Sequence, residues 1–239
     1  MYFLFFTFMK SYLNHVKNVL VILASAFLFF IIILGAFSVM IYDKSFYYTE
    51  YSKNGVYSQL STNRTYATSF ASNVTDNVLD YFKGKSDLKY FSVDEQAHMH
   101  DVKFVISALN FIYYSSSIFF ILIFIILYYI IKKEKINFVD TISKILIFGG
   151  GAALGFLIIV FLWSVFSFET LFLLMHLVFF PQGNWMFPAE SLLITLFPEQ
   201  FFFDIALRIF IYAIIQAIIF LAIGLWFRKQ VNIGKRYRK

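Results

Sequence analysis

Three polar side chains are spaced along one predicted helix so that they could act together on a proton. Ser92 and Glu95 form an S-x-x-E capping box, which predicts a helix that begins near Val93. On this helix Glu95, His98 and Asp101 follow one another at intervals of three residues and share a face. Carboxylates beside an imidazole can hold it in one tautomer and raise its basicity. The stripe therefore predicts acid–base chemistry at His98, and the alternative is a solvated helix end with incidental polar residues.

A second histidine, His176, lies in the apolar run 172–180. A titratable side chain within an apolar segment at membrane depth usually has a function. The alternative is a core histidine that donates to a backbone carbonyl. His98 precedes the second predicted membrane span and His176 follows the third, so both lie at the same outer depth. We therefore expect the two histidines to converge.

The composition indicates a membrane protein. Of 239 residues 60% are hydrophobic and only 14% are charged, a balance that excludes an ordinary soluble enzyme. The absence of cysteine excludes disulfides, thiolate metal sites and a cysteine nucleophile. Windows without Asp, Glu, Lys or Arg are long enough to span a bilayer, which takes about 20 residues, and they lie at 19–42, 104–131, 145–168 and 209–227.

These windows predict an all-α membrane protein with four transmembrane helices, the fourth taken as 205–227, and a small extracytoplasmic cap at 43–103. In the cap we expect one helix, which ends near Gly84, and we leave room for some strand. The run 171–180 is too short to span and is followed by Pro181, so we interpret 169–204 as a re-entrant or interfacial aromatic loop.

Basic residues predict the orientation of these spans. Short segments rich in Lys and Arg face the cytoplasm, so we expect 1–18, 132–144 and 228–239 to be cytoplasmic, and the cap and the aromatic loop to be outside the cell membrane. The net charge of +6 then reflects topology, and we expect no nucleic-acid partner. The basic residues on the cytoplasmic side are Lys10, Lys17, Lys132, Lys133, Lys135, Lys144, Arg228, Lys229, Lys235, Arg236, Arg238 and Lys239.

Other chemistries find less support in the sequence. No G-x-S-x-G element is present for serine hydrolysis, and HExxH is missing, although a metal site built from His98, His176 and carboxylates stays open. Asp204 and Arg208 are spaced i, i+4 and predict a structural ion pair. General acid–base chemistry by histidine on a lipid-borne group is the interpretation that remains.

Several motifs resemble those of the bacterial lipoprotein intramolecular transacylase (Lit) family. They are the E-x-x-H-M-x-D-V-K element at 95–103, His176 within its Phe-rich run, Gly183-x-Trp185, and Phe197-Pro198. The resemblance extends over the chain from about Met9. It implies that His98 and His176 are the two catalytic histidines, with Glu95, Asp101 and Lys103 in support.

The resemblance also implies the reaction. The substrate would be a membrane lipoprotein with an S-diacylglyceryl cysteine, and the sn-2 acyl chain would move to the cysteine α-amino group without a metal or a soluble cofactor. Aromatic side chains would wall the pocket and exclude water, namely Phe179, Phe180, Trp185 and Phe187. Two alternatives are a non-enzymatic accessory protein that binds an extracellular partner, and a metal-dependent membrane hydrolase.

Overall fold

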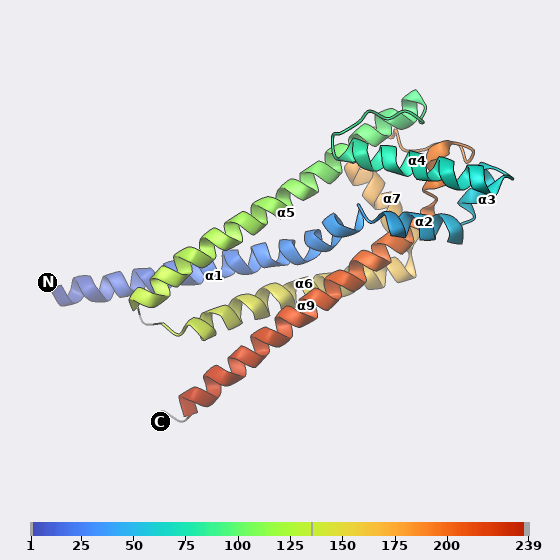
Figure 1. Ribbon diagram of the computed structural model, residues 1–239. Helices are drawn as coiled ribbons and strands as arrows, with labels where there is room; N and C mark the ends of the chain where they lie inside the picture. Colours follow the sequence, from blue (N-terminus) through green and yellow to red (C-terminus); the bar gives the residue numbers. More distant parts are fainter. Residues whose placement is uncertain (1, 135, 237–239) are drawn as a thin grey trace. The chain divides into compact units, whose positions relative to one another are not determined.

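The computed structural model describes residues 2–134 and 136–236, and within them every regular element is a helix (Figure 1). In chain order the helices are α1 (Tyr2–Met40), α2 (Lys44–Lys53), α3 (Val56–Leu60), α4 (Arg64–Phe82), α5 (Val93–Glu134), α6 (Phe138–Phe166), α7 (Phe168–Phe179), α8 (Leu192–Leu196) and α9 (Glu199–Arg236). The all-α prediction is confirmed for this part of the chain.

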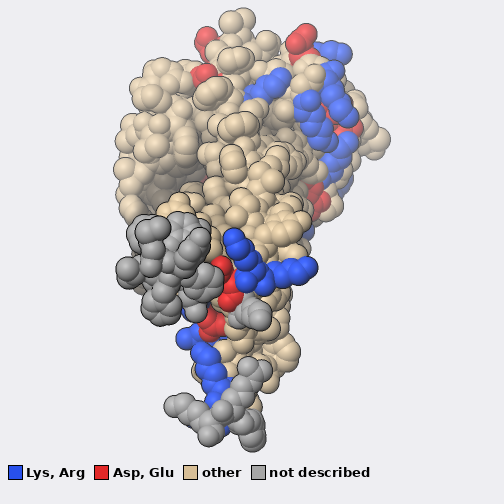
Figure 2. All heavy atoms as spheres, turned by 90° about the vertical axis from the view of Figure 1, so that its left-hand side faces the viewer, with Lys and Arg blue, Asp and Glu red and all other residues tan. Residues whose placement is uncertain are grey.

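Four helices are long and apolar enough to cross a membrane, as predicted. They are Ser11–Met40 within α1, Val93–Glu134, Phe138–Phe166 and Glu199–Arg236. Each extends beyond its predicted window at one or both ends. Figure 2 shows one face of the molecule, on which Lys and Arg side chains gather in groups separated by areas without charge. Lys135, Arg238 and Lys239, which entered the orientation argument, lie outside the described residues.

Local sequence explains where the cap helices begin and end. The capping box at the start of α5 is confirmed, because Glu95 Oε2 accepts the Ser92 N–H at 2.8 Å and Ser92 Oγ accepts the Glu95 N–H at 3.4 Å. Gly84 follows α4 with φ of +73°, a conformation that glycine adopts without strain. The cap has three helices, α2, α3 and α4, where one was expected, and its described residues contain no strand.

The chain divides into two compact units, Met1–Ala36 with Phe111–Ile159 and Ile211–Lys239, and Phe37–Asn110 with Val160–Phe210. In the first unit, glycines let helices approach closely. A Cβ on Gly149 would lie 2.8 Å from the carbonyl oxygen of Ser25, and one on Gly224 would lie 2.9 Å from Leu146 Cβ. Neither separation leaves room for a methyl group, so α6 contacts α1 and α9 through these glycines.

The second unit has its own core, in which the cap helices pack on the residues that follow α7. Tyr51 is fully buried there, and its hydroxyl lies 3.0 Å from Thr75 Oγ1 of α4. The rest of the core is apolar and largely aromatic, with Phe46, Tyr47, Val74, Val78, Leu79, Leu196, Phe197 and Phe201 among its members. This core holds the beginnings of α5 and α9 against the cap.

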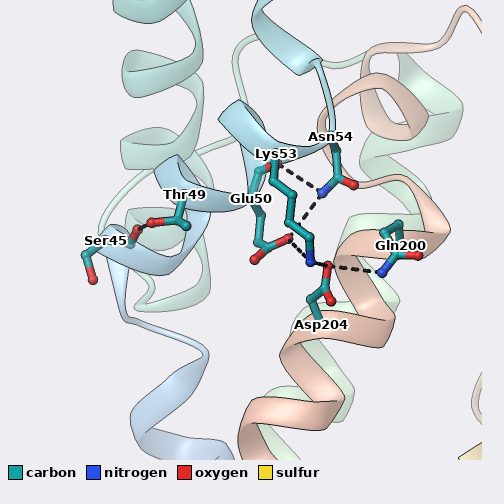
Figure 3. A network of polar contacts seen from close by, with 7 residues as sticks. All are labelled: Ser45, Thr49, Glu50, Lys53, Asn54, Gln200 and Asp204. Atoms are coloured by element: carbon teal, nitrogen blue, oxygen red, sulfur yellow. Dashed lines mark hydrogen bonds and ion pairs between the residues drawn. The ribbon is translucent and has the colours of Figure 1, made fainter. Parts of the chain in front are cut away.

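A polar cluster, which we call the Lys53 network, joins α2 to the first turns of α9 (Figure 3). It consists of Glu50, Lys53, Asn54, Gln200 and Asp204. Lys53 Nζ lies 2.5 Å from Asp204 Oδ2, which also accepts from Gln200 Nε2 at 3.2 Å. Burial, together with the neighbouring Asp204 side chain, raises the pKa of Glu50. The cluster therefore ties together segments far apart in the sequence.

The predicted ion pair between Asp204 and Arg208 is wrong. Arg208 Nη2 lies 3.2 Å from Asp43 Oδ2, whereas Asp204 pairs with Lys53. Both residues keep a structural role, but each binds a cap residue and not its helical neighbour. The i, i+4 spacing permits a pair within a helix, and the partners supplied by tertiary packing displace it.

Candidate active site

The second unit contains a cavity of about 710 Å³ whose wall is almost entirely apolar. This volume falls within the usual range for a small-molecule site. The four aromatic residues predicted to wall a pocket, Phe179, Phe180, Trp185 and Phe187, all line it. His98 and His176 line it too, so the cavity combines an apolar interior with two titratable rings.

The two imidazoles meet in this wall although they come from different elements. His98 lies in the second turn of α5 and His176 near the end of α7, and both are buried. Their ring centroids are 6.4 Å apart with the planes inclined by 18°. The centroid of the Phe180 ring lies 4.8 Å from that of His98 and 5.6 Å from that of His176. The predicted convergence of the two histidines is confirmed.

The backbone of its own helix orients His176. Nδ1 lies 2.8 Å from the carbonyl oxygen of Phe172, one helical turn earlier. Because a carbonyl only accepts hydrogen bonds, Nδ1 must carry the proton and Nε2 must hold the lone pair. Burial lowers the pKa of His176 below its ordinary value of 6.5, and the bond to Phe172 opposes this shift. The ring is thus a neutral base at neutral pH.

The expectation that Glu95 holds the His98 imidazole is wrong. Glu95 is buried, and its carboxylate accepts from the backbone N–H groups of Ser92 and Leu193, each at 2.8 Å. It therefore caps α5 and fastens the start of α8 to it. The Glu95 side chain thus completes the cap of its own helix and also binds a segment distant in the sequence.

Asp101 and Lys103, which we expected to support the two histidines, bind other side chains. Asp101 Oδ2 accepts from Gln182 Nε2 and from Asn184 Nδ2, both at 2.7 Å. Lys103 Nζ lies 4.1 Å from the centroid of the Tyr81 ring, a cation–π contact that joins α5 to α4. Asp101 thus holds the loop that follows α7, and Lys103 holds the cap.

Sequence reasoning missed Gln182 and Asn184. They flank Gly183, whose φ of +78° turns the chain so that both amides reach Asp101. The only local signal was the Pro181–Gly183 turn, which does not say where the flanking amides point. Three buried polar atoms of the site have no hydrogen-bond partner of good geometry among the described residues, namely His98 Nδ1, Asn184 Oδ1 and Trp185 Nε1.

The described residues contain no group of three or more His, Cys, Asp or Glu side chains arranged to hold a metal ion. In the part of the chain that the structure covers, the carboxylates nearest in sequence to His98 are engaged by amide and backbone N–H groups. Among the described residues, no acidic side chain joins the two imidazoles as a third metal ligand.

Comparison with known proteins identifies the family. The sequence model of the family described as lipoprotein intramolecular transacylase Lit matches residues 22–202. The chain belongs to the Lit family. The protein is therefore an acyltransferase of the lipoprotein transacylase kind, and its four apolar helices make it a multi-pass integral membrane protein. Family membership favours an enzyme over the accessory-protein interpretation.

Solved structures of a Lit protein share the fold. The in meso structure of the membrane integral lipoprotein intramolecular transacylase Lit from Bacillus cereus is 20% identical, with a TM-score of 0.77, over 92% of this chain and 99% of that one. Variants of the Bacillus cereus protein in which a histidine is replaced by arginine or by alanine each give a TM-score of 0.73 at 21% identity. None of the curated protein sequences compared with this chain matches it.

Proposed function

We propose that the protein moves the sn-2 acyl chain of an S-diacylglyceryl cysteine to the α-amino group of the same cysteine, with His98 and His176 as the acid–base pair. The observation that carries this proposal is the pair of buried imidazoles, 6.4 Å apart, in the wall of an apolar cavity. The family supplies the reaction class, and the cavity supplies a place for a lipid chain beside two bases.

The transfer needs one bond to form and one to break. The amine nitrogen attacks the sn-2 carbonyl carbon, the new amide bond forms, and the ester bond to the glyceryl oxygen breaks. The attacking amine gives up one proton, and the glyceryl oxygen takes one. The ring closed in the attack has about eight atoms, which is entropically unfavourable, and a cavity that holds both groups in place can contribute several kcal/mol through orientation.

The histidines can carry the protons. A cysteine α-amino group has an ordinary pKa of about 7.7–8.0, so part of it is already neutral near neutral pH, and a neutral imidazole can take up the proton that the nitrogen releases on attack. The Nε2 lone pair of His176 is available, because its Nδ1 proton is bound to Phe172. The imidazole that accepts the amine proton becomes a donor, and the pair can then stabilise the oxyanion and protonate the leaving oxygen.

The aromatic wall supports transfer over hydrolysis. Water that reached the acyl carbon would release a free fatty acid, so a water-poor cavity protects the reaction. Phe180 is buried and contacts both imidazoles, and the Trp185 ring centroid lies 4.7 Å from that of His176. These rings make the surroundings of both imidazoles apolar, so water beside the reacting groups would find few hydrogen-bond partners.

We further propose that the site faces the outside of the cell membrane. The segments proposed as cytoplasmic, up to residue 18, 132–144 and from 228 onward, are rich in Lys and Arg, and His98 and His176 belong to the segments between them. The substrate would then reach the cavity from the outer leaflet of the bilayer. Labelling of single introduced cysteines, one in the cap and one after α9, from either side of the membrane tests this orientation.

Mass spectrometry of a diacyl lipopeptide incubated with the purified protein tests the function. Transfer leaves the mass unchanged and moves one acyl chain from glycerol to nitrogen. We expect His98→Ala and His176→Ala each to lower the rate at least about 10²-fold. His15→Ala and His100→Ala are matched controls, since both side chains are exposed, and they should keep full activity.

Three outcomes would contradict the proposal. Full transfer by either the His98 or the His176 variant would show that the two histidines do not act as an acid–base pair. Release of free fatty acid as the main product would indicate a hydrolase. Loss of activity with a chelator and its recovery with zinc would favour the metal-dependent alternative.

A further inference from the structure

His98 and Asn184 each bury a polar atom without a partner of good geometry. His98 is 7% exposed, and its Nδ1 forms no hydrogen bond with standard distance and angles among the described residues. The same holds for Asn184 Oδ1. Asn184 binds Asp101, which lies one helical turn after His98 on α5, so the two unpartnered atoms belong to the same part of the site.

Asp101 decides which way the Asn184 amide points. Asn184 Nδ2 lies 2.7 Å from Asp101 Oδ2. A carboxylate only accepts hydrogen bonds, so the amide must present its nitrogen to Asp101, and its oxygen is the atom left for another contact. An amide oxygen also only accepts. The His98 atom that meets it must therefore carry a proton.

We propose that Asn184, held by Asp101, is a positioning residue that fixes His98 in the tautomer with hydrogen on Nδ1 and leaves the Nε2 lone pair for the reaction. This inference rests on the proposed function, since it assigns how one of the two bases is prepared. Hydrogen bonds of this kind are often long or bent before substrate binds and become shorter in the complex. The two buried atoms without a partner among the described residues, His98 Nδ1 and Asn184 Oδ1, fit that behaviour.

The consequence for the pair is that both neutral rings present a lone pair at Nε2. His176 reaches this state through the Phe172 carbonyl, and the Asn184 oxygen would bring His98 to it. Neither ring can then donate from Nε2 until it has taken up a proton. The proton removed from the amine is thus the one available for the oxyanion or the leaving oxygen, so the two halves of the transfer are coupled.

Asn184→Ala and Gln182→Ala form a matched pair of variants. Each removes an amide that donates to Asp101 at 2.7 Å, but of the two only Asn184 also buries an oxygen without a partner among the described residues. We expect Asn184→Ala to lower kcat about 10- to 100-fold with little change in KM, the usual cost of losing a group that orients a histidine. Gln182→Ala should change kcat by less than about threefold, because the orienting amide remains.

A spectroscopic measurement separates orientation from folding. Nitrogen-15 NMR of protein with labelled histidine, in nanodiscs, reports which ring nitrogen carries the proton. Asn184→Ala should convert His98 to a mixture of tautomers, while His176 keeps its Nδ1 proton as an internal reference. Asp101→Asn should do the same to a smaller extent, because an amide at 101 can face Asn184 with either of its ends.

The outcomes distinguish this inference from the proposed function. Equal activity of the Asn184 and Gln182 variants, or an unchanged His98 tautomer in Asn184→Ala, would overturn the role of Asn184 and leave the histidine pair intact. Full activity of His98→Ala would overturn the proposed function itself. Should Asn184→Ala not fold, the Asp101→Asn tautomer measurement decides the question.

Discussion

Two polar clusters in the second unit use their hydrogen-bonding groups in different ways. In the Lys53 network, Asp204 Oδ2 accepts from both Lys53 and Gln200, and the Asn54 amide binds Glu50. Around the histidine pair, His98 Nδ1, Asn184 Oδ1 and Trp185 Nε1 are all buried without a hydrogen-bond partner among the residues that the structure describes.

The difference separates a scaffold from a site. A cluster whose members satisfy one another stabilises the fold and has little left to offer a ligand. Buried polar atoms without partners carry a free-energy cost of about 1–3 kcal/mol each, which a protein retains where those atoms have a task. The histidine cluster has this signature and also borders the cavity.

The largest effect we expect is on the pH dependence of the histidine cluster. The imidazole must be neutral to accept a proton, and burial lowers the pKa of His176 below 6.5. The substrate amine itself titrates at about 7.7–8.0 and shapes the acidic limb of any rate profile, so the imidazole has to be followed directly. In nitrogen-15 NMR of protein with labelled histidine, the His176 ring should stay neutral as pH falls through 6.5 and take up a proton only below that pH. A His176 midpoint above 6.5 would break the assignment of His176 as a buried neutral base.

A change in the aromatic wall should have a smaller effect. Phe180→Ala opens space beside both imidazoles, so water gains access and the acyl chain is held less firmly. We expect transfer to fall about tenfold and free fatty acid to appear, measured by mass spectrometry of both products. Phe180→Leu is the control that keeps an apolar side chain. Loss of rate without any fatty acid would assign Phe180 to positioning alone.

The smallest effect on transfer belongs to the Lys53 network. Lys53→Met removes the cation beside two carboxylates, Asp204 and Glu50, whose side chains are 10% and 7% exposed, so the stability should fall by about 1–3 kcal/mol. Transfer should change less than twofold. Thermal melting in detergent and the lipopeptide assay check the two parts. A large loss of activity with little change in melting temperature would show that the network prepares the site, and would remove the contrast between the clusters.

Several features were predictable because they depend on neighbours in the sequence. The capping box placed the start of α5, and intervals of three residues put Glu95, His98 and Asp101 on one face. The bond from His176 to Phe172 spans a single helical turn, so it belongs to the alternative in which a histidine donates to a carbonyl. This alternative is compatible with a functional histidine, because the hydrogen bond to Phe172 uses only Nδ1 and leaves Nε2 for a reaction.

The partners of the charged and amide side chains were not predictable in the same way. Glu95 binds Leu193, Asp101 binds Asn184, and Asp204 binds Lys53, in each case across a long stretch of chain. Spacing predicted that Asp204 would pair with Arg208, and packing gave both residues other partners.

By itself the sequence determined the four apolar helices, the start of α5, the presence of a histidine in each outer segment and the family resemblance. These follow from composition and from contacts within one or two helical turns, which helix geometry dictates. Only the tertiary structure decided that the two rings meet at 6.4 Å in one apolar cavity, and that the carboxylates beside His98 bind elsewhere. Hydrogen bonds between distant segments depend on how those segments pack, and residue spacing carries no record of that packing.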